Sequence, residues 1–467
     1  MNVYEYLKTR NYVTASPEFY TLVDRWRSWY QGNVTKFHEY KVYNGVRHVK
    51  CRRKSLEMAK KLCEDWANLL MNERVKITIR DEKTHDFVHR VFAENNFWVK
   101  INESQEVKSA VGTVAYLPYA DQVEITDGSV VSGKSIRITY VPAENIFPLS
   151  WKNGEIQECA FSSLHTVEGK NYLFLQIHAF ESDGYGIENV LFSLQGDQLQ
   201  EVSDFSTVKG FESVVKKIRT LSHEKQFVID RLNIANNLDP NNPMGVSVYA
   251  NAMDLLEGLD LIYDSYINEF MLGKKRIMVR DEAIQYMGDE PVFDDNDVVF
   301  YRIPPDMSDD SFIKEIDMNL RITEHQTGIR DLLNTLAAKC GFGENHYKFD
   351  QGNVMTATQV ISENSTLFRV LKKHEIILEN VLKSLVRIVV RIGIQVLKQP
   401  FTIPELDEIT IDFDDSIIED QRTEFNDMRQ DVAAGLLRPE LYVAKRYGVS
   451  EEEAKNLMPK AADLLEE

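Results

Sequence analysis

Apolar residues recur with a helical period through the middle of the chain. From 246 to 273 their three- and four-residue spacing predicts one long amphipathic helix that ends at Gly273; its apolar positions are 252, 255, 256, 259, 262, 263, 266, 267 and 270. A second helix is expected to begin near Ile313 or Met318 and to end at Cys340, before two glycines. A third, very long helix is predicted over 356–398, with Thr356 and Gln359 as a capping box.

The segments between and after these helices have different patterns. Residues 274–315 are rich in Pro and Asp and contain short apolar runs, which predicts a compact insert with strands. A polar loop over 342–355 leads into the longest helix, and FTIPELDEITIDFDDS after it indicates one or two strands. The acidic tail 417–465 is predicted to be helical, with a helix ending near Gly435 and a capping box of Ser450 and Glu453.

The first half combines both periods. Residues 17–80 are interpreted as helices, at SPEFYTLVDRWRSWYQG and KSLEMAKKLCEDWANLLMNE, and FVHRVFAENN (87–96) keeps helical spacing. Residues 75–230 are otherwise β-rich: VKITIR, FWVKIN, GTVAYLPY, QVEIT, SIRITYV, NYLFLQIHAF and NVLFSL alternate or run apolar. LDPNNPMG (238–245) is a boundary. The expected fold class is therefore α+β.

GSVVSGKS, residues 128–135, matches the phosphate-loop pattern G-x-x-x-x-G-K-[ST]. That loop works by joining a strand to a helix whose N-terminal N–H groups converge on the phosphates. Here SIRITYV alternates like a strand after the motif, and QVEIT alternates before it. The pattern therefore favours a β-hairpin with a Gly/Ser tip, and an NTPase site is the minor alternative.

Composition narrows the class of protein. The 467 residues carry a net charge of −19, which argues against a protein that wraps DNA in a basic surface. Four cysteines without C-x-x-C spacing argue against a disulfide scaffold or a zinc site and fit a reducing compartment. The start is polar, without signal-peptide character. The most apolar stretch, 376–397, has a charge every four residues, so it is an amphipathic helix rather than a membrane span.

Three short patterns could carry chemistry. CGFGENHYKFD (340–350) contains Cys340 and His346, but a thiolate nucleophile needs a base, an orienting partner and a pocket, and the glycines fit helix ends. DDND (294–297) lacks the Gly and Glu of a calcium loop. The basic run KCRRK (50–54) is either solvated surface or a contact for phosphate or an acidic partner. No enzyme activity, cofactor or metal is expected.

Several segments resemble phage portal proteins, in particular those of long-tailed phages and prophages of low-GC Gram-positive bacteria. The resemblance is carried by WRSWYQG, KCRRKSLEMAKKLCEDWANLLMNE, the stretch FYRIPPDMSDDSFIKEIDMNLRITEHQTGIRDLLNTLAAKCGFGENHYKFDQGNVMTATQVISENS, and AAGLLRPELYVAKRYGVSEEEA. Individually they are weak motifs. Their order and spacing across most of the chain are more specific.

The resemblance implies an α+β portal fold with these regions: a wing at 1–245, stem helices at 246–273 and 316–341, a clip at 274–315, a tunnel loop at 342–355, a long wing helix with following strands at 356–417, and a helical crown at 418–467. It implies tunnel-loop contacts with DNA by Asn345, His346, Tyr347 and Lys348, and contacts at the junction of stem and clip by Lys274, Lys275, Arg276 and Arg280. Stem and oligomer packing is expected from Leu255, Leu259, Ile262, Tyr266, Leu332 and Leu336.

The same resemblance implies a homo-oligomeric ring, typically of about twelve subunits, at a capsid vertex of the virion, after assembly in the host cytoplasm. Its implied partners are double-stranded DNA in a channel, the terminase large subunit, a head-to-tail connector protein, and the major capsid and scaffolding proteins, with no membrane. The alternatives are a monomeric capsid-associated adaptor and the NTPase. A polar substitution in the stem, such as Leu259→Asp, is expected to prevent ring assembly.

Overall fold

The computed structural model describes most of the chain, with gaps. The described residues are 2–43, 45–71, 75–126, 129–182, 184–196, 198–220, 222–273, 276–280, 286–287, 290–291, 300–303, 313–316, 319–343, 346–347, 357–413, 421–447, 449 and 451–458. All structural statements below concern these residues.

Two sheets, antiparallel except at one strand pair, form the β-rich part of the body. The larger has the order β5-β6-β13-β11-β10-β9-β8, with β12 paired to β11. Its strands are β5 (Glu124–Thr126), β6 (Ser129–Ser132), β8 (Ile146–Lys152), β9 (Glu155–Val167), β10 (Lys170–Glu181), β11 (Gly184–Gln195), β12 (Gln198–Glu201) and β13 (Lys217–Arg219). The smaller has the order β14-β4-β7, from β4 (Thr113–Asp121), β7 (Ser135–Pro142) and β14 (Val228–Arg231).

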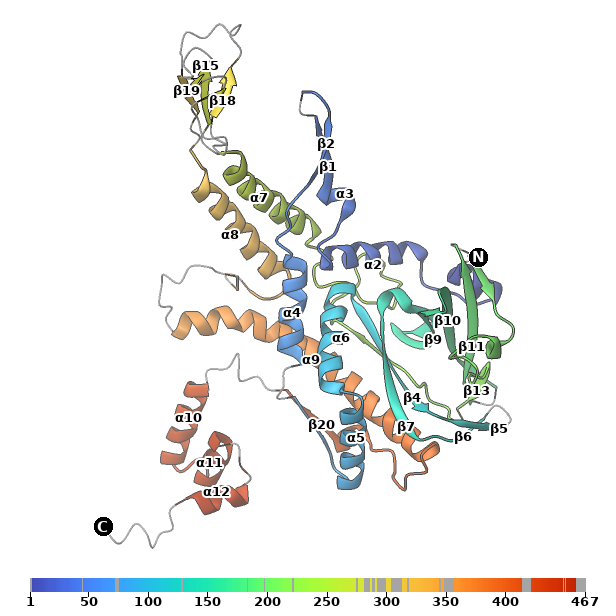
Figure 1. Ribbon diagram of the computed structural model, residues 1–467. Helices are drawn as coiled ribbons and strands as arrows, with labels where there is room; N and C mark the ends of the chain where they lie inside the picture. Colours follow the sequence, from blue (N-terminus) through green and yellow to red (C-terminus); the bar gives the residue numbers. More distant parts are fainter. Residues whose placement is uncertain are drawn as a thin grey trace.

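Helices and one small sheet complete the body (Figure 1). The helices are α1 (Val3–Thr9), α2 (Pro17–Tyr30), α3 (Thr35–His38), α4 (Met58–Leu70), α5 (Glu82–Glu94), α6 (Phe97–Val111) and α9 (Ala357–Gln395). Strand β3 (Lys76–Ile79) pairs with β20 (Ile409–Asp412), which brings the two halves of the chain together beside α5. The main core includes Trp26, Trp66 and Phe92, all almost fully buried.

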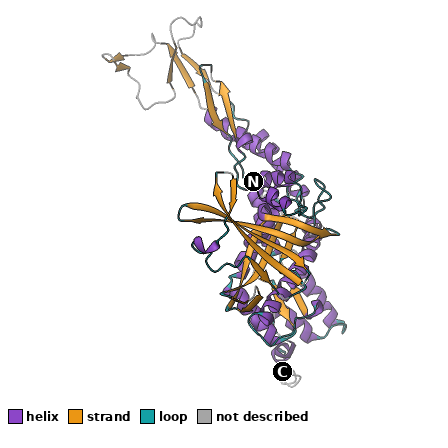
Figure 2. Ribbon diagram, turned by 90° about the vertical axis from the view of Figure 1, so that its right-hand side faces the viewer, coloured by secondary structure: helices purple, strands orange, loops and turns teal. Residues whose placement is uncertain are grey.

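Two antiparallel helices leave the body and carry strands at their far end (Figures 1 and 2). They are α7 (Met253–Leu272) and α8 (Ile322–Lys339), called here the helix pair. The strands between them are β15 (Arg276–Arg280), β16 (Tyr286–Met287), β17 (Glu290–Pro291), β18 (Phe300–Ile303) and β19 (Ile313–Ile316). β15 lies between β18 and β19. A second protrusion is the two-stranded hairpin of β1 (Glu39–Tyr43) and β2 (His48–Arg52).

The C-terminal part is helical. It contains α10 (Gln421–Ala433), α11 (Pro439–Tyr447) and α12 (Glu451–Leu457), a small group that lies apart from the sheets in Figure 1. The predicted helical tail is thus confirmed within 421–458, as are the long helix α9, the helix starting at Ser16-Pro17, and the strands predicted in the 113–195 region. The predicted capping residues Thr356 and Ser450 lie outside the described residues.

Four sequence predictions were wrong in detail. FWVKIN (97–102) is the start of helix α6, not a strand. The interpretation of 17–80 as helical missed the β1–β2 hairpin. The first helix of the pair begins at Met253 rather than at 246. The second begins at Ile322 rather than at Ile313 or Met318, because 313–316 form strand β19. Strand β19 hydrogen-bonds to β15, and this pairing favours extended backbone there.

Acid is expected to weaken the fold through His374 on α9. Its ring is buried against Trp66, and Nδ1 accepts a hydrogen bond from the Asn233 backbone N–H (3.1 Å). Burial lowers the pKa of His374 from 6.5 to about 3, with Lys108 and Lys373 adding to the effect. The unfolded chain therefore binds a proton that the folded chain does not, so stability is lost as pH falls from about 6.5 toward 3, by up to about 1.4 kcal/mol per pH unit.

Denaturant unfolding of wild type and His374→Gln at pH 7, 6 and 5 checks this expectation. The variant should lose less stability on acidification, because glutamine has no proton to take up. His48→Gln, on the exposed β2 strand, is the matched control and should keep the wild-type slope. Identical slopes for all three proteins would contradict the assignment to His374.

Candidate functional site

The helix pair is packed closely through glycines. A Cβ on Gly258 of α7 would lie 3.4 Å from Leu332 of α8, and one on Gly328 of α8 would lie 3.4 Å from Ile262 of α7. Further along, Tyr266 packs its ring on His325, and Glu269 accepts a hydrogen bond from Arg321 Nε (2.8 Å). These contacts pack α7 and α8 against each other along their length.

The six predicted packing residues divide into two groups. Leu259 and Leu336 are fully buried inside the chain, while Leu255, Ile262, Tyr266 and Leu332 are half-buried. Since Leu259 is part of the subunit's own core, Leu259→Asp is expected to damage the fold of the single chain and is a poor test of assembly. Exposed apolar residues that the sequence prediction did not select are Leu261, Phe270 and Met271 on α7 and Leu320 before α8.

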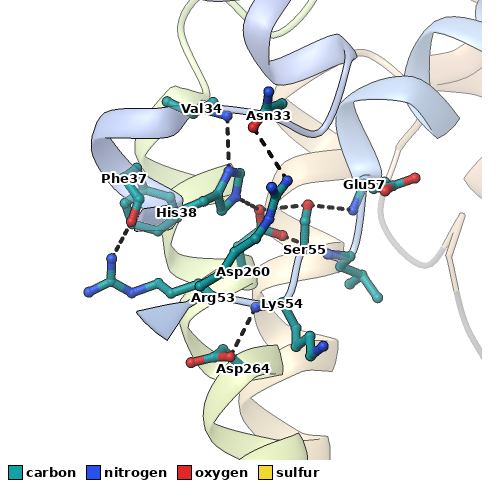
Figure 3. Close-up of polar contacts among 12 residues, drawn as sticks. Asn33, Val34, Phe37, His38, Arg53, Lys54, Ser55, Glu57, Asp260 and Asp264 are labelled. Carbon is teal, nitrogen blue, oxygen red and sulfur yellow. Dashed lines mark hydrogen bonds and ion pairs between the residues drawn. The ribbon is translucent and has the colours of Figure 1, made fainter. Parts of the chain in front are cut away.

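A buried carboxylate joins α7 to the N-terminal part of the chain (Figure 3). Asp260 accepts hydrogen bonds from the Leu56 backbone N–H (2.8 Å), from Ser55 Oγ (2.8 Å) and from His38 Nε2 (2.9 Å). Val34 N–H donates to His38 Nδ1 (3.0 Å), which leaves the ring proton on Nε2, facing Asp260. We call Asp260, His38 and Ser55 the Asp260 cluster. Ser55 contacts the carboxylate and not the imidazole, so this is not a nucleophile with its base.

One turn further along α7, Asp264 holds the end of the basic run. It accepts a hydrogen bond from the Lys54 backbone N–H (2.9 Å) and one from Asn268 Nδ2 (3.1 Å). The guanidinium of Arg53 lies over the rings of Tyr40 (4.5 Å) and Phe37 (4.9 Å). The basic run thus lies on β2 and at its junction with α7, which the sequence pattern alone did not indicate.

The loop after α8 folds back onto α4 in the part that the structure describes. Gly341 has a positive φ of 92°, and a Cβ there would come within 2.9 Å of Val370. His346 stacks on Phe342 at 4.5 Å, and the Tyr347 hydroxyl donates to Asp65 Oδ2 on α4 (2.9 Å). Two of the four predicted tunnel-loop residues are therefore placed beside α4, while Asn345 and Lys348 lie outside the described residues.

The pKa shifts of Tyr347 and Asp65 agree with this hydrogen bond. Burial, and then the nearby Asp65 carboxylate, raises the pKa of Tyr347 well above its usual value. Burial alone would raise the pKa of Asp65, but the His346 ring, 3.8 Å away, and hydrogen bonds from Lys61 and Tyr347 outweigh it and hold that pKa below its usual value. The Tyr347 hydroxyl therefore stays a donor, and the Asp65 carboxylate stays an acceptor.

The Cys340–His346 pair has no nucleophile geometry. Cys340 is buried at the end of α8, its backbone oxygen accepts from Trp66 Nε1 (3.1 Å), and burial raises the pKa of its thiol to about 12. A thiol with so high a pKa is not a thiolate near neutral pH. Cys340 is thus a buried core residue.

The phosphate-loop motif continues into a strand, as the alternating pattern predicts. β7 begins at Ser135 and pairs along β4, and the Lys134 backbone N–H donates to the Asp121 carbonyl (3.1 Å). The hairpin differs from the predicted one, because Ser129–Ser132 form strand β6, which pairs with β5, while β7 pairs with β4. No helix N-terminus follows Lys134 and Ser135, so the motif lacks the anion site that a phosphate loop needs.

Of the four predicted cations at the end of the helix pair, the structure describes two. Arg276 and Arg280 are the first and last residues of β15, whereas Lys274 and Lys275 lie outside the described residues. Within the described part of the chain, no three His, Cys, Asp or Glu side chains gather as metal ligands. A search of the same residues for a helix that could cross a membrane found none.

Comparisons with known proteins identify the family. Among solved structures, one match is a chain in the neck of a native GTA particle computed with C12 symmetry. The two sequences are 9% identical, the match covers 84% of this chain and 89% of that chain, and the TM-score is 0.44. A search of curated proteins found no match. The family model for "Phage portal protein, SPP1 Gp6-like" matches residues 10–463, so this chain belongs to the SPP1 Gp6-like phage portal protein family, whose members are structural proteins of the phage particle.

Proposed function

We propose that this chain forms a homo-oligomeric ring at a capsid vertex, with a central channel for DNA packaging and ejection. The observation that supports this best is the helix pair, in a chain of the portal family. α7 and α8 leave the body side by side and carry β15, β18 and β19 at their far end (Figure 1). Such an arm suits a ring whose body and far end contact different partners.

The proposed regions follow the sequence expectation. In that assignment the body from 1 to 245 is the wing, the helix pair is the stem, residues 274–315 form the clip, 342–355 the tunnel loop, 356–417 the long wing helix with its strands, and 418–467 the crown. The clip would dock the head-to-tail connector. The terminase, which is the packaging motor, and the capsid and scaffolding proteins would contact other faces of the ring.

Charge supports a channel that does not hold DNA tightly. The chain has a net charge of −19, and an acidic or mixed lining repels phosphates, so a duplex stays centred and slides. The side chains proposed to make transient contacts are Lys348 and His346 in the loop after α8, and Lys274, Lys275, Arg276 and Arg280 between helix pair and strands.

Mass and shape of the purified protein test the proposal. Native mass spectrometry together with negative-stain imaging is expected to give closed particles of about twelve subunits with a central hole. A protein that stays monomeric across concentration and salt, also when mixed with its scaffolding and capsid proteins, would contradict the ring and support a monomeric adaptor.

A further inference from the structure

The β1–β2 hairpin stands away from the body, beside the helix pair and on the same side of the molecule (Figures 1 and 2). Its strands pair only with each other, over five residue pairs from Glu39–Arg52 to Tyr43–His48. Tyr40 and Cys51 are half-buried, and the other eight strand residues are exposed. A two-stranded hairpin with no further packing is marginal in water.

The two faces of this hairpin differ in chemistry. Directly paired residues share a face, so Tyr40, Cys51, Val42 and Val49 form one apolar face. Lys41 faces Lys50 on the other side, next to the Glu39–Arg52 and Tyr43–His48 pairs. Like charges placed opposite each other weaken a strand pair. This chain thus leaves an apolar face uncovered, with Val42 45% and Val49 36% exposed, on an element that needs support.

The hairpin also has the opposite charge to its surroundings. Residues 36–54 contain seven Lys or Arg and one acidic residue, in a chain with a net charge of −19. Helix α7 contains five carboxylates and no Lys or Arg. Leu261 of this helix is 51% exposed, and Asp254, two turns earlier on the same face, is exposed as well.

Ring symmetry brings these two elements together. Subunits of a ring are related by rotation about one axis, so an element keeps its height along that axis in every copy. The hairpin lies beside its own helix pair, and with the pair along the channel it meets the helix pair of the next subunit at the same height. A basic face alone would also fit DNA. The apolar face would not be buried against a phosphate backbone, so its presence favours a protein partner.

We propose that the β1–β2 hairpin of one subunit packs its apolar face over Leu261 on α7 of the neighbouring subunit. The inference rests on the proposed ring. Four carboxylates of α7 are already paired within their own subunit, whereas Asp254 is exposed. Lysine side chains are long enough to bend round the open strand edges, so Lys41 and Lys50 reach Asp254 of that α7. The Asp260 cluster fixes the base of the hairpin, residues 53–56, to its own α7, so each subunit holds its hairpin in place for the next.

The test combines two substitutions on the apolar face, Val42→Asp and Val49→Asp, in the full chain. Ring formation at a fixed subunit concentration, measured by native mass spectrometry, is expected to fall about tenfold or more, since apolar burial is lost at every interface. Val42 and Val49 are directly paired, so two aspartates there repel each other within the hairpin. The single variant Val42→Asp avoids this repulsion, so its monomer should keep the wild-type melting temperature and its ring formation should still fall. The matched control is Val131→Asp, on β6 and 44% exposed, which should assemble like wild type.

A second measurement reports contact directly. With Leu261→Cys, mild oxidation is expected to join residue 261 to the native Cys51 of a neighbour and give dimers on a non-reducing gel; Cys63, Cys159 and Cys340 are buried. Leu164→Cys, 65% exposed on β9, is the control. A wild type that forms no ring would defeat the proposed function, and this inference with it. If the wild type forms rings and the double variant forms them to the same extent, this inference alone is overturned. If the rings of the double variant also retain less duplex DNA than wild-type rings, the hairpin is a nucleic-acid contact.

Discussion

Replacing Asp260 with alanine is expected to destabilise the protein by about 3–5 kcal/mol, because a buried network loses its common acceptor. Three donors depend on this carboxylate: the Leu56 N–H, the Ser55 hydroxyl and His38 Nε2. Asp260 and His38 are both almost fully buried, so water cannot replace the lost oxygen atoms without opening the site. Urea unfolding followed by circular dichroism measures the loss.

Asp254→Ala is the matched control for this experiment. It lies on the same helix but is exposed, and it should change stability by no more than about 0.5 kcal/mol. Asp260→Asn keeps the shape and one acceptor oxygen, so its loss should lie between the two. Equal stability of Asp260→Ala and Asp254→Ala would show that the cluster does not support the fold.

Sequence patterns predicted the long elements of this fold well because their periods are repeated many times. Helix α9 has its apolar stripe over 39 residues, and the β9, β10 and β11 strands are each at least 12 residues long. The Asp260 cluster had no such signal. His38, Ser55 and Asp260 are each ordinary polar residues, and 205 positions separate Ser55 from its acceptor.

The missed hairpin had a local signal of its own. Asn44-Gly45 between KVY and VRHV is a strong short-range sign of a tight β-turn. The helical spacing of the apolar residues on both sides of this turn led to the interpretation of 17–80 as helical. Exposure could not have been predicted either, since alternation tells which residues share a face but not whether any other element covers that face.

The strand predicted at FWVKIN was wrong for an instructive reason. Phe97, Val99 and Ile101 alternate as in a strand, but the helix buries Phe97 and Ile101 and leaves Val99 half exposed. Further along α6, the buried face continues with Gln105 and Lys108. These polar residues hide the helical stripe from any count of apolar positions, and their burial is possible only because Asp230 on β14 is there to pair with them.

Lys108→Met is therefore expected to cost about 3–5 kcal/mol, since it leaves the Asp230 carboxylate buried without its cation. Lys108 and Asp230 are 1% and 0% exposed, and Nζ lies 3.0 Å from Oδ1. Burial lowers the pKa of Lys108, and the contact with Asp230 opposes that effect. The free energy of unfolding in urea at pH 7 measures the loss, with Lys100→Met on the exposed side of the same helix as the matched control.

The double variant Lys108→Met with Asp230→Asn separates loss of the pair from loss of packing. Asparagine keeps an oxygen that can accept from Gln105 Nε2 and the Tyr116 hydroxyl, now 2.7 and 2.9 Å from Asp230 Oδ2. No charge remains buried, so most of the stability lost in Lys108→Met should return. If the double variant is as unstable as the single one, the cost comes from the methionine side chain in this space and not from the unpaired carboxylate.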